Sequence, residues 1–261
     1  MQTMLDMDEH HWWYRGRRRI IDVELRKLAL PSHARVLDAG CGSGRTLQEL
    51  GRYGEVSGIE LSPDAAAVAR DRGAFDVRIG RLEELPWPDQ TFDLITCLDV
   101  IEHTPDDRVT LRELHRVTRR GGHLLVTVPA YQALWSQHDV DNHHFRRYER
   151  EPLRQAAEQS GWTVTRLTSF NSVLLPAAAA VRLIQRRRMR PAGNGNANGN
   201  ENRNGNANAN ADRDDFKADL NLGPAWLNGL LEQPLHYEAR WLARGRTLPA
   251  GLSLLAVLTR P

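Results

Sequence analysis

Cysteine is scarce in this chain: only Cys41 and Cys97 occur among the 261 residues, far apart and each inside an apolar, strand-like stretch. Neither has a metal-ligand spacing, so both are expected to be buried in the core. A strong excess of one charge is also missing, because the net charge of +2 is too small to indicate nucleic-acid binding by itself. No apolar run reaches the roughly 20 residues that a membrane span requires. Together these absences predict a protein of the reducing cytoplasm.

Short apolar or β-branched runs alternate with helical patterns through most of the chain. The predicted strands lie at 35–40, 55–61, 75–80, 92–99, 122–130, 163–170 and 252–260. One helix is predicted to begin with Ser62 as N-cap and Pro63 at the first helical position. Another is predicted to begin at Thr104 and to end at Gly121–Gly122. Strands and helices repeated in this order predict right-handed crossovers and a parallel sheet that helices cover on both faces.

One segment departs from globular composition. Asparagine occupies every even-numbered position from Asn194 to Asn210. Such a tract cannot bury enough apolar surface to offset the entropy cost of ordering it. We therefore predict a single domain in four segments: an N-terminal helical lid or substrate-side segment at 1–34, a core at 35–192, a disordered linker at 193–213, and a helix with a final strand at 214–261.

A glycine-rich turn follows the first predicted strand. Gly40, Gly42 and Gly44 let the backbone turn sharply and approach a ligand closely, and open α/β sheets bind ligands at the carboxyl ends of their strands. A dinucleotide site usually has the spacing G-x-G-x-x-G, whereas this turn has G-x-G-x-G with Asp38 ahead of it. A carboxylate beside the turn opposes a phosphate and favours an ammonium or sulfonium group.

Further acidic residues follow the next strands. Glu60 ends the second strand, where a carboxylate can accept hydrogen bonds from both hydroxyls of a ribose. Leu82 and Glu83 follow the third strand, where an adenine edge would lie, and Asp99 follows the fourth. A ligand with a ribose, an adenine and a positive charge but no phosphate fits this set best. S-adenosylmethionine is such a ligand.

The sequence resembles the class I S-adenosylmethionine-dependent methyltransferases of the small-molecule type 11/12 group. The pieces that carry the resemblance stand in the expected order between Val36 and Pro129: VLDAGCGSG, GIELSPDAAAVAR, LPWPDQTFDLITCLDVIEH and LRELHRVTRRGGHLLVTVP. The resemblance implies a Rossmann-like α/β fold. Its sheet would be mostly parallel and seven-stranded, with helices on both faces and an antiparallel last strand.

The same resemblance implies roles for individual residues. All of them would line the cofactor, from its amino-acid end through the ribose to the adenine. The set comprises Asp38 and Gly40 at the amino-acid end, Gly42 and Gly44 in the turn, Glu60 at the ribose, Leu61, Leu82 and Glu83 around the adenine, and Asp99 on the methionine side.

The first candidate catalytic cluster is the segment DVIEH at residues 99–103. It resembles the E-x-x-E-H segment of metal-dependent O-methyltransferases, such as those of ubiquinone biosynthesis, and of small-RNA terminal methyltransferases. By that resemblance Asp99, Glu102 and His103 would hold a divalent cation. The alternative, which we favour, is that Glu102 and His103 cap the helix that follows. A role for His103 as a general base needs no metal and stays open.

The second candidate cluster is SQHDVDNHHFRRYER at residues 136–150, in the loop after the fifth strand. A similar stretch appears in a bacterial subgroup of these methyltransferases. His138, His144 and Tyr148 are its candidate catalytic residues, and its arginines suit carboxylates or phosphates on a substrate. The alternative is a loop held together by its own ion pairs and hydrogen bonds.

Two stretches combine apolar or aromatic residues with arginines, HHWWYRGRR at 10–18 and SVLLPAAAAVRLIQRRRMR at 172–190. They would allow peripheral contact with an anionic membrane and access to a lipid-linked acceptor. A hydrophobic lid over the pocket is the alternative that we favour.

The predicted function is the transfer of a methyl group from S-adenosylmethionine to a small-molecule or lipid-precursor acceptor, on oxygen rather than nitrogen or carbon. Two alternatives stay open. An NAD-dependent oxidoreductase would share the fold, although Asp38 and the glycine spacing disfavour it. A non-catalytic module would use the fold to dock at membranes or partners. RNA methylation is disfavoured by the near-neutral charge and the lack of a recognisable RNA-binding appendage.

Overall fold

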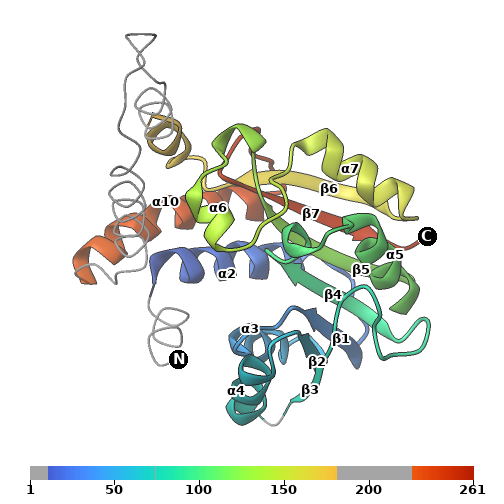
Figure 1. The fold of residues 1–261 in the computed structure, drawn as a ribbon. Coiled ribbons are helices and arrows are strands. Elements are labelled where there is room, and N and C mark those ends of the chain that lie inside the picture. The colour runs from blue at the N-terminus through green and yellow to red at the C-terminus, as the bar shows by residue number, and fades with distance from the viewer. Residues whose placement is uncertain (1–10, 74, 181–224) are drawn as a thin grey trace, which may run out of the picture.

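The chain folds around one seven-stranded sheet (Figure 1), seen in a computed structural model that describes residues 11–73, 75–180 and 225–261. The strands are β1 (Ala34–Ala39), β2 (Gly54–Glu60), β3 (Asp76–Ile79), β4 (Phe92–Leu98), β5 (Thr118–Pro129), β6 (Thr163–Phe170) and β7 (Ser253–Thr259). Their order in the sheet is β3-β2-β1-β4-β5-β7-β6. The neighbours from β3 to β5 pair in parallel, whereas β7 runs antiparallel to both β5 and β6. The predicted fold class is confirmed, including the antiparallel last strand.

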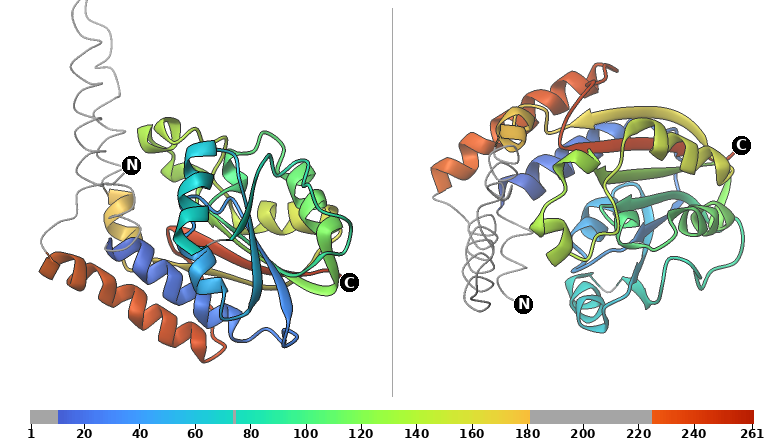
Figure 2. Two further views of the ribbon diagram at one scale, coloured as in Figure 1. Left: turned by 90° about the horizontal axis from the view of Figure 1, so that it is seen from below. Right: turned by 45° about the horizontal axis from the view of Figure 1, so that its top comes forward.

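Helices cover both faces of the sheet (Figure 2). Four of them contribute buried residues to the core on one face: α2 (Trp12–Leu25), α3 (Arg45–Leu50), α4 (Pro63–Gly73) and α10 (Ala225–Ala243). The core on the other face includes residues of α5 (Asp107–Val117) and α7 (Arg150–Gln159). Because both faces are covered, β7 is buried along almost its whole length. Cys41 and Cys97 are buried free thiols, as predicted.

The helix boundaries were predicted with mixed success. Helix α4 begins at Pro63, and the hydroxyl of Ser62 accepts a hydrogen bond from the N–H of Ala65 at 3.3 Å. The prediction for α5 is wrong at both ends, because the helix is capped at Asp106 rather than Thr104 and ends at Val117 rather than Gly121. Asp106 is its N-cap and accepts the N–H of Arg108 at 2.9 Å.

The predicted cap residue Thr104 has another role. Its hydroxyl donates to the carbonyl of Ile101 at 2.8 Å and so closes the 3-10 turn η1 (Ile101–His103). At the other end, Gly121 and Gly122 lie inside β5 and exchange backbone hydrogen bonds with Arg260. This segment therefore belongs to β5 and not to α5, which ends at Val117.

Helices α2 and α10 lie side by side, although they come from opposite ends of the chain (Figure 2). A Cβ at Gly16 would stand 2.2 Å from Leu235, so glycine is what allows this close approach. Arg15 pairs with Glu232 at 3.2 Å, and Lys27 donates to the carbonyl of Leu242 at 2.6 Å. Strand β7, which follows α10 in the chain, lies between β5 and β6 in the main sheet.

Two predicted features fall wholly or partly outside the described residues. The predicted linker at 193–213 and the arginines at 186–190 are outside. Of the apolar stretch at 172–190, residues 175–180 are helical. Across the ranges that the structure describes, no helix is long and apolar enough to cross a membrane.

Candidate functional site

Three acidic residues converge at one edge of the sheet because their strands are neighbours. Asp38 lies near the end of β1, Glu60 ends β2, and Asp99 follows β4. In the sheet β1 lies between β2 and β4, and the three strands are parallel. Their carboxyl ends therefore meet, as the sequence predicted.

The glycine turn between β1 and α3 has the backbone that the sequence predicted. Gly40, Gly42 and Gly44 all have positive φ angles, +83°, +53° and +83°. A Cβ at Gly40 would stand 2.6 Å from Val100, and one at Gly44 would stand 2.8 Å from Ala69. At Gly42 no atom lies within 4 Å of the Cβ position. Two of these glycines are therefore required by packing, while Gly42 borders open space into which a ligand can fit.

Asp38 is a buried carboxyl group next to this turn. Its side chain accepts a hydrogen bond from the hydroxyl of Thr96 on β4 at 2.6 Å. Burial raises the pKa of Asp38 to about 6, although the Thr96 hydrogen bond and the nearby Arg17 lower it in part. A buried carboxyl group whose pKa is raised in this way is typical of functional sites. Sequence reasoning missed Thr96, because its pairing with Asp38 depends on the alignment of β1 with β4.

Glu60 ties the turn to the end of β2. One carboxylate oxygen accepts the N–H of Gly42 and the other accepts the N–H of Ser62, each at 2.9 Å. The neighbouring Leu61 is 63% exposed and Ile79, at the end of β3, is 49% exposed. Both exposed side chains flank the edge predicted for adenine, because Glu60 and Ile79 are paired across β2 and β3.

The side chains in the turn after β3 are less exposed to solvent. Leu82 is buried, and Glu83 is half-buried and paired with Arg81 at 3.5 Å. Both lie after β3, at the sheet edge where the sequence analysis expected the adenine ring.

Asp99 is engaged by a residue that sequence reasoning assigned elsewhere. It has a positive φ of 57°, and its carboxylate pairs with the guanidinium of Arg17 from α2. The stretch 10–18 was expected to form a hydrophobic lid or to contact an anionic membrane. Three of its arginines pair with the protein's own carboxylates: Arg15 with Glu232, Arg17 with Asp99 and Arg18 with Glu49.

A signal for Arg17 was present in the sequence. Ile20, Ile21 and Glu24 follow it at helical spacings of three, four and seven residues, and all three are buried. Arg17 therefore stands on the face of α2 that meets the body of the protein.

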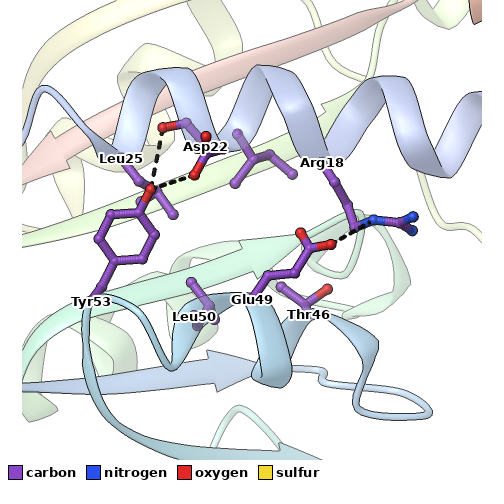
Figure 3. Close-up of a pocket in the computed structure, with 8 residues that line it drawn as sticks. Arg18, Asp22, Leu25, Thr46, Glu49, Leu50 and Tyr53 are labelled. Carbon is purple, nitrogen blue, oxygen red and sulfur yellow. Dashed lines mark hydrogen bonds and ion pairs between the residues drawn. The ribbon is translucent and has the colours of Figure 1, made fainter.

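A pocket between α2 and α3 is distinct from this site (Figure 3). It is lined by side chains of both helices and by Tyr53, whose hydroxyl donates to Asp22 at 2.7 Å. Arg18 and Glu49 pair across the same contact at 3.0 Å. None of the acidic residues or glycines of the candidate site lines it, so this pocket marks the contact that holds α2 against α3.

A second cluster lies just beyond Asp99. Glu102 is buried, and within the described residues no hydrogen bond reaches either of its carboxylate oxygens. Burial, and then the charge of Asp99, raise the pKa of Glu102 well above its usual range. A buried carboxyl group without a hydrogen-bond partner is costly, and its raised pKa favours the protonated form.

Two imidazoles accompany Glu102. The rings of His103 and His144 meet edge to face with centroids 4.6 Å apart, and one potential ligand atom from each of the three residues lies within 4.8 Å of the others. Burial and the nearby His144 lower the pKa of His103. The loop is held here because the N–H of Phe145 donates to the carbonyl of Glu102 at 2.7 Å.

This cluster differs from the predicted metal set of Asp99, Glu102 and His103. The group that the fold gathers is Glu102, His103 and His144, whereas Asp99 pairs with Arg17. One carboxylate and two imidazoles are a donor set that suits a divalent transition metal.

The remaining candidate catalytic residues are not members of this group of three. Tyr148 is buried, and its hydroxyl donates to Asp107 at 2.7 Å, which together with burial raises its pKa. His138 lies on the short helix α6 (Gln137–Asp141), where its carbonyl accepts the side-chain N–H of Asn142 at 2.8 Å.

Comparison with known proteins adds independent information. Residues 37–126 match the family model described as a methyltransferase domain. The ubiquinone biosynthesis O-methyltransferase of Xanthomonas oryzae is 37% identical over 102 residues, which are 36% of this chain and 42% of that protein. A Mycolicibacterium smegmatis protein named "Probable S-adenosylmethionine-dependent methyltransferase" is 31% identical over 169 residues, 62% of this chain and 64% of that one. The chain thus spans less than half the length of the first relative.

Solved structures agree on the fold. Phosphoethanolamine N-methyltransferase 2 of Haemonchus contortus, in complex with S-adenosyl-L-methionine, aligns with a TM-score of 0.57 and 17% identity. The alignment covers 94% of this chain and 52% of that one. Residues 37–126 are thus similar to the type 11 methyltransferase domain, and the seven-stranded sheet has the fold of the class I methyltransferases.

Proposed function

We propose that this protein transfers a methyl group from S-adenosylmethionine to a small-molecule or lipid-precursor acceptor, with oxygen as the favoured acceptor atom. The observation that carries the proposal is the set of carboxyl groups around the glycine turn. Asp38, Glu60 and Asp99 surround a backbone that is open at Gly42. Acidic groups in this arrangement favour a cationic nucleoside over a nucleotide phosphate.

The roles within the cofactor site follow from position. Glu60 would accept the ribose hydroxyls with lone pairs that its two backbone hydrogen bonds leave unused. The exposed side chain of Leu61 would cover the adenine, with Leu82 and Glu83 on its other side. Asp38 and the glycines would receive the amino-acid end, and Asp99 the methionine side. When bound, S-adenosylmethionine supplies a methyl group on a sulfonium leaving group.

The cluster of Glu102, His103 and His144 supports an oxygen acceptor. Holding the acceptor in line with the methyl group can lower the barrier of such a transfer by several kcal/mol, roughly 7 to 11 at most. A hydroxyl must in addition lose its proton, and a neutral imidazole is suited to take it. The cluster supplies two imidazoles for this step, His103 and His144, and burial lowers the pKa of His103.

A divalent cation is the second candidate for the same cluster, supported by the partnerless carboxylate of Glu102. Glu102, His103 and His144 would hold it, and it would polarise the acceptor hydroxyl. A chelator separates the two cases. Loss of transfer with chelator and its return with added metal would favour the cation, whereas unchanged transfer would favour the metal-free base.

We further propose that the protein works in the cytoplasm, in peripheral contact with anionic membranes. Free thiols at Cys41 and Cys97 agree with a reducing compartment. On α10 an outward stripe is formed by exposed apolar and aromatic residues, namely Leu230, Tyr237 and Trp241. Exposed arginines accompany it, namely Arg240, Arg244 and Arg246. Aromatic and basic residues on one face favour an anionic bilayer surface.

Sedimentation with vesicles tests this contact. We expect the protein to bind vesicles of phosphatidylglycerol but not vesicles of phosphatidylcholine. This binding should be lost when Tyr237 and Trp241 are both replaced by serine. Equal binding to both lipids, or to neither, would contradict it.

The experiment for the activity itself uses S-adenosylmethionine labelled at its methyl group, incubated with the protein and extract of its source cells. Label in the organic phase would identify a lipid or lipid-like acceptor, and label in the aqueous phase a soluble metabolite. No label above that of a Glu60→Ala control would overturn the proposed activity. The family match offers no support for an oxidoreductase or a non-catalytic docking module.

A further inference from the structure

Asp139, in the loop after β5, is a buried carboxylate with an unusually full set of partners. Its side chain is fully buried on α6. One oxygen accepts the N–H and the hydroxyl of Ser136 at 2.9 and 3.1 Å. The other accepts the Nε–H of Arg147 at 2.7 Å and lies 2.9 Å from Nδ1 of His144. Burial alone would raise the pKa of Asp139, but the hydrogen bonds from His144 and Arg147 outweigh it and hold the pKa well below its usual range.

The backbone reinforces the contact between Asp139 and His144. The N–H of His144 donates to the carbonyl of Asp139 at 2.9 Å, so the two residues are joined through both main chain and side chain. His143 between them has a positive φ of 57° and turns the chain back. A histidine fixed in this way has little freedom to rotate its ring.

The bond to Asp139 also decides which nitrogen of His144 is available. An ionised carboxylate can only accept, so Nδ1 must carry the hydrogen. In the neutral ring Nε2 is then left with a free lone pair. One ring nitrogen of His144 lies within 4.8 Å of a potential ligand atom of Glu102 and of His103, and Nε2 is the nitrogen that the bond to Asp139 leaves available.

We propose that Asp139 is a positioning residue that fixes His144 as the Nδ1–H tautomer and presents its Nε2 lone pair to the acceptor hydroxyl beside Glu102 and His103. The inference rests on the proposed function and deepens it, because it assigns the acceptor a hydroxyl group. A carboxylate that orients an imidazole in this way is a recurrent device in enzymes.

The step then balances. The O–H bond of the acceptor breaks and its proton passes to Nε2, which leaves an imidazolium held by the charge of Asp139. The acceptor oxygen forms a bond to the methyl carbon as the carbon–sulfur bond breaks. The sulfonium leaves as a neutral thioether, S-adenosylhomocysteine, and His144 returns its proton to solvent.

Other features agree with this assignment. Of the two imidazoles in the cluster, His144 is the one hydrogen-bonded to a carboxylate, whereas His103 is bonded by backbone groups of Asn142 and His143. Arg147 neutralises Asp139 and also donates to the carbonyl of Ala130 at 3.4 Å, which anchors the carboxylate to the end of β5. A structural clamp through this bond would need the same Nδ1–H, so the positioning role is separated from a structural one by the effect of Asp139→Asn on kcat at unchanged cofactor affinity.

The test is nitrogen NMR of the ¹⁵N-labelled full chain at neutral pH, with long-range proton–nitrogen correlations of the histidine rings. The His144 signals are assigned by their loss in His144→Gln. The expected spectrum shows His144 with hydrogen on Nδ1 and none on Nε2. A ring protonated on Nε2, whether as the other tautomer or as imidazolium, would overturn the proposal. The wild-type spectrum decides this even where a variant fails to fold.

A pair of variants extends the test. In Asp139→Asn the amide can donate as well as accept, so the fixed tautomer should be lost. In the control Asp141→Asn, an exposed residue of the same short helix bonded to Gln137, it should persist. Once an acceptor is identified, Asp139→Asn should lower kcat by roughly a hundredfold, with unchanged affinity for S-adenosylmethionine. Equal loss of cofactor affinity would point to a structural clamp instead.

The two proposals fail separately. Absence of methyl transfer in the wild type alongside the expected tautomer would remove the proposed function and leave the positioning of His144 standing. Methyl transfer by a protein whose His144 is protonated on Nε2 would leave the proposed function standing and remove the positioning role of Asp139.

Discussion

Replacing the glycines of the turn one at a time separates packing from ligand binding. Gly42 and Gly44 both have left-handed backbones, so alanine at either position costs about 1 to 2 kcal/mol of folding stability. At Gly44 the new Cβ would also stand 2.8 Å from the Cα and Cβ of Ala69, and such overpacking adds about 1 to 3 kcal/mol. At Gly42 no atom lies within 4 Å. Gly44→Ala should therefore be clearly the less stable protein.

Ligand binding should be affected differently. The methyl group of Gly42→Ala would enter the space assigned to S-adenosylmethionine. The same overpacking penalty of about 1 to 3 kcal/mol, now against the ligand, corresponds to a dissociation constant raised about fivefold to a hundredfold. Urea unfolding gives the stabilities, and calorimetric titration with S-adenosylmethionine gives the affinities. Wild-type affinity in Gly42→Ala, or equal stability losses in the two variants, would refute this account of the turn.

Three further outcomes are expected. Because burial raises the pKa of Asp38 to about 6 in the folded protein, the native state holds a proton that the unfolded state releases. The free energy of unfolding should therefore fall by roughly 3 kcal/mol as pH rises from about 4 to about 6. Asp38→Asn should lack this fall and bind S-adenosylmethionine more weakly. A wild-type free energy of unfolding by urea that stays constant across that pH range would contradict the reasoning. Leu61→Ala should change stability by less than about 0.5 kcal/mol yet weaken cofactor binding measurably by calorimetry, and unchanged affinity would remove Leu61 from the adenine site. Tyr53→Phe should cost about 1 kcal/mol in urea unfolding through its lost hydrogen bond to Asp22, with unchanged cofactor affinity; a tenfold loss of affinity would mean that the pocket in Figure 3 has a binding role.

The strands and the glycine turn were predictable because their signals are local. β-branched runs, the three glycines and the acidic residue at each strand end lie within a few residues of one another. The parallel topology then brings Asp38, Glu60 and Asp99 together without further information. The start of α5 was missed because Thr104 and Asp106 are both good caps, and the turn at Ile101 takes the threonine.

The contacts that complete the site depend on long-range packing. Arg17 reaches Asp99 across 82 residues of sequence, and Thr96 reaches Asp38 across 58. His144 joins Glu102 because Phe145 bonds to the turn that carries it. No periodicity in the sequence specifies which loop returns to which turn, so the replacement of Asp99 by His144 in the cluster was visible only in the fold. The catalytic roles of His103, His138, His144 and Tyr148 stay predictions.

The most direct test of the central claim is calorimetric titration of the purified chain with S-adenosylmethionine and, separately, with NADH, in wild type and Glu60→Ala. The account predicts saturable binding of one S-adenosylmethionine per chain, at least about tenfold weaker in a folded Glu60→Ala protein, and no heat with NADH. Binding of NADH without S-adenosylmethionine, or equal affinity in the variant, would contradict it.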